Sequence, residues 1–190
     1  MDEVVSTAWV WGMVVAMGFQ LLDEIIQTDY GQFDIVWGGG FGFDGEFRQF
    51  FAGQSNGLVG AADANGVYLH FGRRSGGSSV RIELLTQQPP APVAPWEDVV
   101  EVSVHVTEHA EPHWSSWAGE SGGPLLLPPD TYRVRVSARG RDAGQDGEFA
   151  EDVVDFYLVE FWRAPFQPDS ILSVGSANAE YWHREIGGRR

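Results

Sequence analysis

Apolar and polar residues alternate with a period of two along two long segments of this chain. From residue 100 to residue 107, every even position is valine and every odd position is polar. From residue 132 to residue 139, the even positions are apolar and three of the odd positions are arginine. A period of two predicts strands with one buried face. Glu101 facing the arginine row would suit cross-strand pairing if these strands are neighbours.

Further strands are predicted on both sides of this pair. In the segment 25–37, Phe33 and Ile35 lie on one face and Asp34 on the other, and residues 67–71 and 80–84 alternate in the same way. Residues 153–162 are almost continuously apolar, which is typical of a central strand. The Asn-Gly pair at 65–66 predicts a hairpin turn. Short strands with turn residues between them predict an all-β fold: a single antiparallel β-sandwich of about eight or nine strands.

The chain divides into three parts. Residues 1–22 form an apolar arm, residues 23–165 the β-sandwich domain, and residues 166–190 a polar tail with one short helix expected. Fourteen of the nineteen residues from 4 to 22 are apolar and none is charged. A helix packed on the protein or on a second copy, an extra strand, and a membrane span all remain open for the arm. Asp2 and Glu3 precede it and no arginine flanks it, which disfavours the membrane alternative.

A proline-rich segment at residues 87–95 contains four prolines. Prolines at this density favour an extended chain without regular hydrogen bonding. We expect this segment to be a strap that links two halves of the sandwich.

The charge of the chain limits its partners. The formal net charge is −15, with 27 acidic and 12 basic residues. Direct binding of nucleic acid is disfavoured, because it depends on lysine and arginine displacing counterions from phosphates. A basic protein partner would be attracted instead.

Two residue types are missing altogether. Cysteine is absent and all 12 basic residues are arginine. These absences exclude disulfides, thiol catalysis, cysteine-ligated metals and the lysine-dependent nucleotide and Schiff-base sites. We expect no enzyme activity, no catalytic residues and no cofactor.

Two motifs suggest chemistry that their surroundings do not support. The segment 119–125, GESGGPL, resembles the nucleophile segment of chymotrypsin-like proteases. No histidine precedes His70, so the base that such a protease needs upstream is missing, and a glycine-rich turn into a strand at 125–127 is the better prediction. His105, His109 and His113 have a metal-like spacing, but a strand followed by a loop separates them. We therefore predict no metal site.

Two acidic segments are the candidate binding sites. Trp114 and Trp117 accompany the first, in a stretch rich in Ser, Gly and Glu that we expect to be a loop. Tryptophan beside carboxylates suits a protein-binding anchor with a charged rim, or a surface on which sugars stack. Tryptophans that fold back over the open end of the sandwich are the structural alternative. The predicted partner-binding residues are Glu108, Glu111, Trp114, Trp117, Asp142, Asp146, Glu148, Glu151 and Asp152.

Four segments resemble a known family. They are 30–36 (YGQFDIV), 57–63 (GLVGAAD), 104–108 (VHVTE) and 127–132 (LPPDTY). In this order they resemble the bacterial competence protein J (ComJ) family, small β-sandwich proteins that inhibit a DNA-entry nuclease. The resemblance covers residues 25–163 and implies a sandwich fold and an inhibitory role.

The acidic half of the chain is compatible with that role. Residues 97–160 contain fourteen acidic residues and four arginines, which suits contact with the basic cleft of a nuclease. We expect a cytoplasmic, non-enzymatic inhibitor or immunity-like partner of a basic protein. A carbohydrate-binding module and an assembly subunit that self-associates through residues 1–22 are the alternatives.

Overall fold

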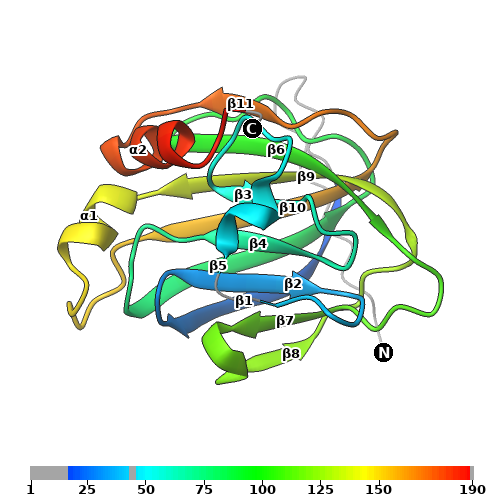
Figure 1. Ribbon diagram of the computed structural model, residues 1–190, viewed down its shortest axis with the longest axis horizontal. Helices are drawn as coiled ribbons and strands as arrows, with labels where there is room; N and C mark the ends of the chain where they lie inside the picture. Colours follow the sequence, from blue (N-terminus) through cyan, green and yellow to red (C-terminus); the bar gives the residue numbers. More distant parts are fainter. Residues whose placement is uncertain (1–16, 43–45, 189–190) are drawn as a thin grey trace.

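Two β-sheets make up the body of the protein (Figure 1). The computed structural model describes residues 17–42 and 46–188. In these residues a six-stranded sheet has the order β1-β5-β10-β9-β6-β11, and a five-stranded sheet has the order β3-β4-β2-β7-β8. The strands of the larger sheet are β1 (Gly18–Thr28), β5 (Gly76–Leu85), β6 (Asp98–Val106), β9 (Asp130–Arg139), β10 (Phe156–Arg163) and β11 (Ser170–Ser173). Those of the smaller sheet are β2 (Gln32–Val36), β3 (Val59–Gly60), β4 (Gly66–His70), β7 (His113–Ser116) and β8 (Gly122–Pro124).

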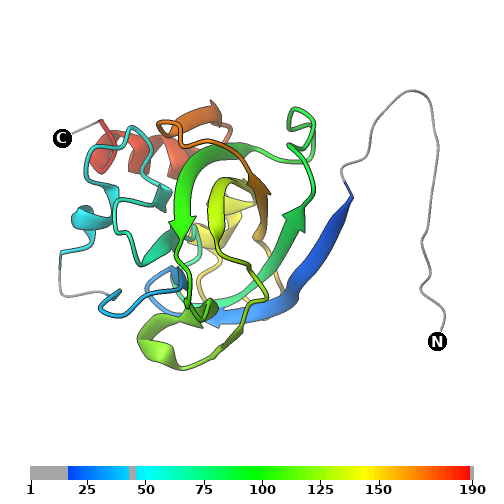
Figure 2. The same ribbon diagram turned by 90° about the vertical axis from the view of Figure 1, so that its right-hand side faces the viewer.

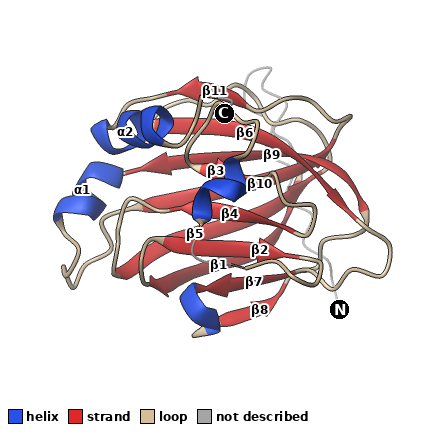
Figure 3. Ribbon diagram, in the orientation of Figure 1, coloured by secondary structure: helices blue, strands red, loops and turns tan. Residues whose placement is uncertain are grey.

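Short helices lie outside the sheets (Figure 3). The 3₁₀ helices are η1 (Phe47–Phe51) and η2 (Trp117–Gly119), and the α-helices are α1 (Arg141–Asp146) and α2 (Ala177–Glu185). Ser176 is the N-cap of helix α2, and its side chain accepts a hydrogen bond from the Ala179 amide. The all-β fold class predicted from the sequence is therefore confirmed.

The inward faces of the two sheets share one hydrophobic cluster. The smaller sheet contributes Phe33, Ile35 and Trp114, and the larger sheet contributes residues such as Val100 and Val134. Figure 2 shows the larger sheet curving from blue β1 to orange β11 around this interior. The alternating valines and aromatic residues of the sequence thus form the core.

The polar faces of β6 and β9 are buried too, contrary to the expectation of half-buried strands. The two strands are neighbours, and Glu101 lies opposite Arg135 in their register. The Glu101 carboxylate is 2.8 Å from Arg135 Nη2 and 3.1 Å from Arg133 Nε. Arg133 also donates to the carbonyls of residues 167 and 168, and Arg135 donates to that of Pro90. The proline-rich segment and the tail therefore cover this face, and ion pairing compensates its charges.

Three details differ from the predicted sandwich. The described residues form eleven strands, more than the eight or nine expected, because short strands such as β3, β8 and β11 lack a readable period. The six-stranded sheet is mixed and not purely antiparallel, since β10 pairs with β5 in parallel. The strap at 87–95 joins β5 to β6 within one sheet instead of linking the two sheets. Strand β10 is central, as its continuous apolar character predicted.

Regular structure extends into both terminal segments. Strand β1 begins at Gly18, inside the expected arm, for which an extra strand is one of the alternatives. Strand β11 and helix α2 lie beyond residue 165, in the tail where one short helix is expected. The rest of the arm, residues 1–16, lies outside the described residues. No helix in the described part of the chain is long and apolar enough to cross a membrane. The strand predicted over 25–37 is divided in two at Tyr30 and Gly31, which both have positive φ angles.

Candidate functional site

The predicted acidic residues fall into two groups at opposite ends of the molecule. Figure 1 shows the connection between β6 and β7 at one end of the long axis and α1 at the other. Glu108 and Glu111 lie in the first region and are exposed. Asp142 and Asp146 lie in α1. The structure therefore does not bring all the predicted residues together into one surface.

The two predicted tryptophans have different environments. Trp114 lies in β7 with 7% of its surface exposed, and its ring stacks on Phe33 at 5.9 Å. The expectation of a loop position for Trp114 is wrong, because its strand pairs with β2 and directs the indole into the core. Trp117 lies in η2, is half-buried, and contacts the exposed Tyr30 with ring centroids 5.2 Å apart.

Trp117 is connected to the acidic segment near α1. The Arg74 guanidinium lies over the Tyr30 ring at 5.2 Å, and Arg74 Nε is 4.0 Å from the Glu148 carboxylate. The four side chains form a continuous strip across the surface, which we call the Trp117 strip: Trp117, Tyr30, Arg74 and Glu148. Two of the predicted residues, Trp117 and Glu148, are thus neighbours through two residues that the sequence did not single out.

The backbone around this strip is strained. Tyr30 has a φ angle of 55° and Ala118 one of 53°, both in the left-handed region that non-glycine residues seldom adopt. Such residues persist where surrounding contacts enforce them, and they concentrate at binding sites. The two positive-φ residues flank the contact between the Tyr30 and Trp117 rings.

The buried side chain of Arg73 holds the segment 142–152 through hydrogen bonds to its backbone. This arginine is 1% exposed, and its guanidinium donates to the carbonyls of Glu148, Ala150 and Asp152. The same side chain reaches Ser75 and Gly77 on the other side. The carbonyls point inward, and the side chains of Glu151 and Asp152 are left exposed to solvent.

Asp142 has a structural contact. Its two carboxylate oxygens accept hydrogen bonds from the Ala177 amide at 3.0 Å and the Asn178 amide at 2.8 Å. Asp142 therefore caps the first turn of α2 and ties that helix to α1. This contact is one that the sequence did not indicate, and the Asp142 side chain remains exposed.

The outer face of the five-stranded sheet is covered over only part of its area. Tyr68 on β4 packs under Phe50 and Phe51 of η1, and Ile186 after α2 completes this second cluster. Over β2 and β7 an open pocket of about 440 Å³ remains. Its lining includes Gln32, Asp34, Phe41, His113, Ser115 and Trp117, and we call it the Asp34 pocket.

Asp34 is the unusual group in this pocket. It is 5% exposed and lies opposite Ser115 in the register of β2 and β7. Its Oδ2 accepts a hydrogen bond of 2.6 Å from Gln32 Nε2, and its Oδ1 has no partner among the described residues. Burial raises the pKa of Asp34 to about 7, and the Gln32 bond only partly opposes this shift.

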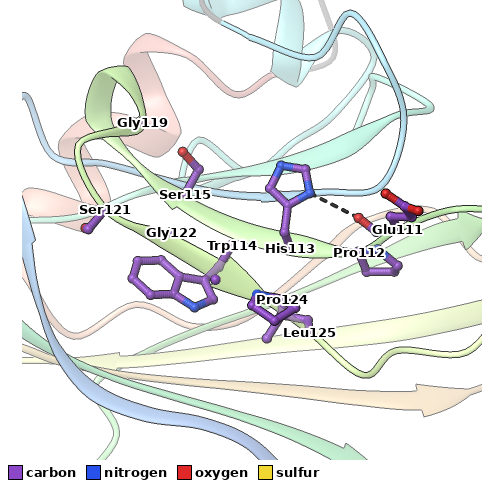
Figure 4. A pocket seen from close by; sticks show the side chains of 11 residues that line it. Glu111, Pro112, His113, Trp114, Ser115, Gly119, Ser121, Gly122, Pro124 and Leu125 are labelled. Carbon is purple, nitrogen blue, oxygen red and sulfur yellow. Dashed lines mark hydrogen bonds between the residues drawn. The ribbon is translucent and has the colours of Figure 1, made fainter.

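The protease-like segment lines a second pocket, of about 710 Å³ (Figure 4). Ser121 Oγ donates to Ser116 Oγ at 2.9 Å. Figure 4 shows the His113 ring away from Ser121, with Nδ1 at 3.1 Å from the Glu111 carbonyl. The serine and this histidine therefore do not form a nucleophile and base pair.

The three closely spaced histidines are also separated. His105 Nδ1 lies 3.0 Å from Thr131 Oγ1 on β9, whereas His113 lies on β7 in the other sheet. His109 occupies the connection between them, with a φ angle of 68°. Among residues 17–42 and 46–188, no group of three or more His, Asp or Glu side chains is placed to hold a metal ion.

Comparison with known proteins identifies the fold. No family model and no curated protein matches the sequence. Two solved structures are similar. ComJ from Bacillus subtilis, described as an inhibitor of the DNA degrading activity of NucA, superimposes with a TM-score of 0.53 and 19% sequence identity. The match covers 78% of this chain and all of ComJ. The protein of crocagin biosynthetic gene J matches with a TM-score of 0.49 and 12% identity over 78% of this chain and 99% of its own. This protein has a ComJ-like fold.

Proposed function

We propose that this protein is a cytoplasmic, non-enzymatic inhibitor of a basic protein, with a nuclease as the leading candidate partner. The observation that carries the proposal is the fold match with ComJ, which spans the whole of that nuclease inhibitor. The net charge of −15 supports it, since an acidic surface can occupy the basic cleft that holds DNA.

The proposed contact surface is the Trp117 strip together with the acidic residues beside it. Aromatic side chains supply most of the binding energy in many interfaces, and charged rims mainly accelerate association. Trp117 and Tyr30 provide exposed aromatic area with their rings in contact. The acidic rim consists of Asp146, Glu148, Glu151 and Asp152. Glu108 and Glu111, at the far end, form a separate acidic area that only a large partner would reach.

A capture experiment tests this surface. The tagged protein is incubated with native lysate at low salt, and retained proteins are eluted by salt. We expect a basic protein at one-to-one stoichiometry, and the variant with Glu151→Gln and Asp152→Asn retains less of it. The matched control, Glu108→Gln with Glu111→Gln, removes the same charge from the far end. If both variants lose binding equally, the effect is one of net charge and the proposed surface is wrong.

Self-association is a second candidate function, favoured by one observation. Strand β1 is an edge of the six-stranded sheet, and Phe19 and Ile25 on it are 69% and 60% exposed. An exposed edge strand with apolar side chains is a template for pairing with another chain. Light scattering over a range of concentrations, on the full chain and on a form lacking residues 1–16, tests this proposal. A monomer at all concentrations in both forms overturns it.

A further inference from the structure

The Asp34 pocket contains a buried carboxylate oxygen for which the described residues supply no partner. Asp34 is 5% exposed, and only Oδ2 has a hydrogen bond, from Gln32. A buried carboxylate oxygen without a donor costs free energy unless a ligand supplies one. The missing donor thus points to something that enters the pocket.

The lining of the pocket indicates the charge of that ligand. In the sheet register Asp34 lies between Tyr68 of β4 and Ser115 of β7. His113, which lines the pocket together with Ser115, lies two register pairs along on β7. None of the ion pairs within the described residues involves Asp34. Without a neighbouring cation, the pocket favours a positively charged group.

The walls of the pocket indicate the shape of that ligand. Phe41 and Trp117 both line it, so the pocket combines aromatic walls with the carboxylate. A guanidinium group is planar, stacks on aromatic faces, and donates several hydrogen bonds to carboxylate and amide oxygens. An ammonium group is a compact, more strongly hydrated charge and benefits less from such walls. The volume of about 440 Å³ lies in the range of small-ligand pockets.

We propose that the Asp34 pocket binds the guanidinium group of an arginine side chain, presented by the basic protein partner. Asp34 pairs with the cation, and Trp117 and Phe41 stack against its plane. The inference rests on the proposed function for the source of the arginine. It connects the pocket with the Trp117 strip, because Trp117 belongs to both.

Binding of the guanidinium group is coupled to release of a proton from Asp34. The Asp34 carboxyl has a pKa of about 7 in the free protein, so it is partly protonated at neutral pH. A bound guanidinium favours the carboxylate and lowers that pKa. Affinity is therefore expected to rise as the pH increases from about 6 to about 8, and binding releases a proton in this window.

The test of the pocket uses N-acetyl-arginine methylamide and the protein alone. Binding is followed by the ¹³C resonance of the Asp34 carboxyl group and by amide shifts. We expect saturable binding that is weakened at least about tenfold by Asp34→Asn. The control variant Asp23→Asn, which removes the same charge at an exposed position of β1, leaves it unchanged. Lysine in place of arginine in the probe binds more weakly.

Two results overturn the proposal: equal affinity in Asp34→Asn, or no saturable shift of the Asp34 resonance. A second variant, Trp117→Leu, removes the stacking wall and keeps the carboxyl group, and it should also weaken binding. Asp34→Asn is a near-isosteric change, and an unchanged amide spectrum elsewhere shows that the fold is intact.

The source of the arginine is tested separately with the captured partner. Weaker capture by Asp34→Asn than by Asp23→Asn supports a partner arginine. Equal capture by both variants, with probe binding lost only in Asp34→Asn, overturns the partner as the source and assigns the pocket to a free guanidinium compound. If no partner is captured while the probe still binds, the proposed function is wrong, but guanidinium binding by the Asp34 pocket is supported.

Discussion

Glu101 and Arg135 lie directly opposite each other on β6 and β9, with Arg135 Nη2 2.8 Å from Glu101 Oε1. Both side chains are almost fully buried. Arg133 shares the same carboxylate, and Trp162 lies 5.5 Å from the Arg135 guanidinium. The Glu101 carboxylate thus pairs with two buried arginines on the covered face of the larger sheet, and Glu160 lies opposite Arg135 on β10.

Removing this carboxylate should destabilise the protein strongly. Glu101→Ala leaves two guanidinium groups buried without their anion, and the expected loss in free energy of unfolding is about 3 to 5 kcal/mol. Urea denaturation measures the change. The control is Arg81→Ala, which breaks the Arg81–Glu83 pair at a site where the arginine side chain is 50% exposed, with an expected cost below about 1 kcal/mol. Similar losses in the two variants would contradict the role given to Glu101.

Truncation of Trp114 should mainly reduce stability, whereas truncation of Trp117 should mainly reduce partner binding. Trp114→Ala removes a core side chain, with an expected cost of about 3 to 5 kcal/mol. Trp117→Ala affects a half-buried surface residue and should cost about 1 kcal/mol or less, while it weakens partner capture. Thermal unfolding and capture assays on both variants separate the roles. A folded Trp117→Ala protein with unchanged capture would remove Trp117 from the proposed surface.

Arg73 should control the stability of the acidic segment. Arg73→Met retains much of the apolar volume and removes the donors that hold the carbonyls of Glu148, Ala150 and Asp152. Phe149 is 85% exposed, so chymotrypsin can report local opening. We expect cleavage there to be at least about tenfold faster. A hydrogen bond to a charged group contributes at least about 1.5 kcal/mol, and losing that much free energy of local opening raises the open population about tenfold. Arg81→Met, at an exposed position away from this segment, is the control.

Asp34→Asn should stabilise the protein at neutral and alkaline pH. The folded pKa of Asp34, about 7, lies above its ordinary value of 3.8, so the native state loses stability as pH rises through this window. Below about pH 4 the carboxyl is protonated in both states, and the variant should match the wild type. The difference in unfolding free energy should therefore grow between about pH 4 and pH 7.

The same window contains an opposite effect from His70. Burial, with a smaller contribution from Arg141, lowers the pKa of His70 to about 3. Stability is therefore lost as pH falls below the ordinary histidine value of 6.5. This contribution cancels in the comparison of Asp34→Asn with the wild type. A difference that is constant with pH would contradict the raised pKa of Asp34.

Much of the larger sheet could be predicted from local pattern. The alternation in 100–107 and 132–139 predicts two strands and the residues that face the core, because a pleated strand alternates its faces regardless of its neighbours. The same pattern did not reveal that the polar faces are buried. That burial depends on 87–95 and 164–170, which are irregular segments without periodicity and which pack on the sheet through backbone carbonyls.

The candidate site depended on pairings that sequence does not show. The residues around Trp114 are rich in Ser, Gly and Glu and predict a loop, whereas Trp114 lies in a strand of four residues and its burial follows from pairing with β2. The sequence pattern predicts Asp34 on the polar face of its strand. Its confinement requires β7 beside it and the segment around Phe41 above it. Tyr30 and Arg74 carry no motif, and only their contact with Trp117 and Glu148 reveals them.

Inhibition of a basic nuclease through the Trp117 strip can be measured on the salt-eluted partner, by following DNA degradation as purified protein is added. We expect loss of the DNA-degrading activity with an end point at one-to-one stoichiometry, and a shifted end point or weaker inhibition with Trp117→Ala. A captured partner that degrades no DNA, or whose DNA degradation is unaffected by a stoichiometric amount of the protein, would contradict the proposed function.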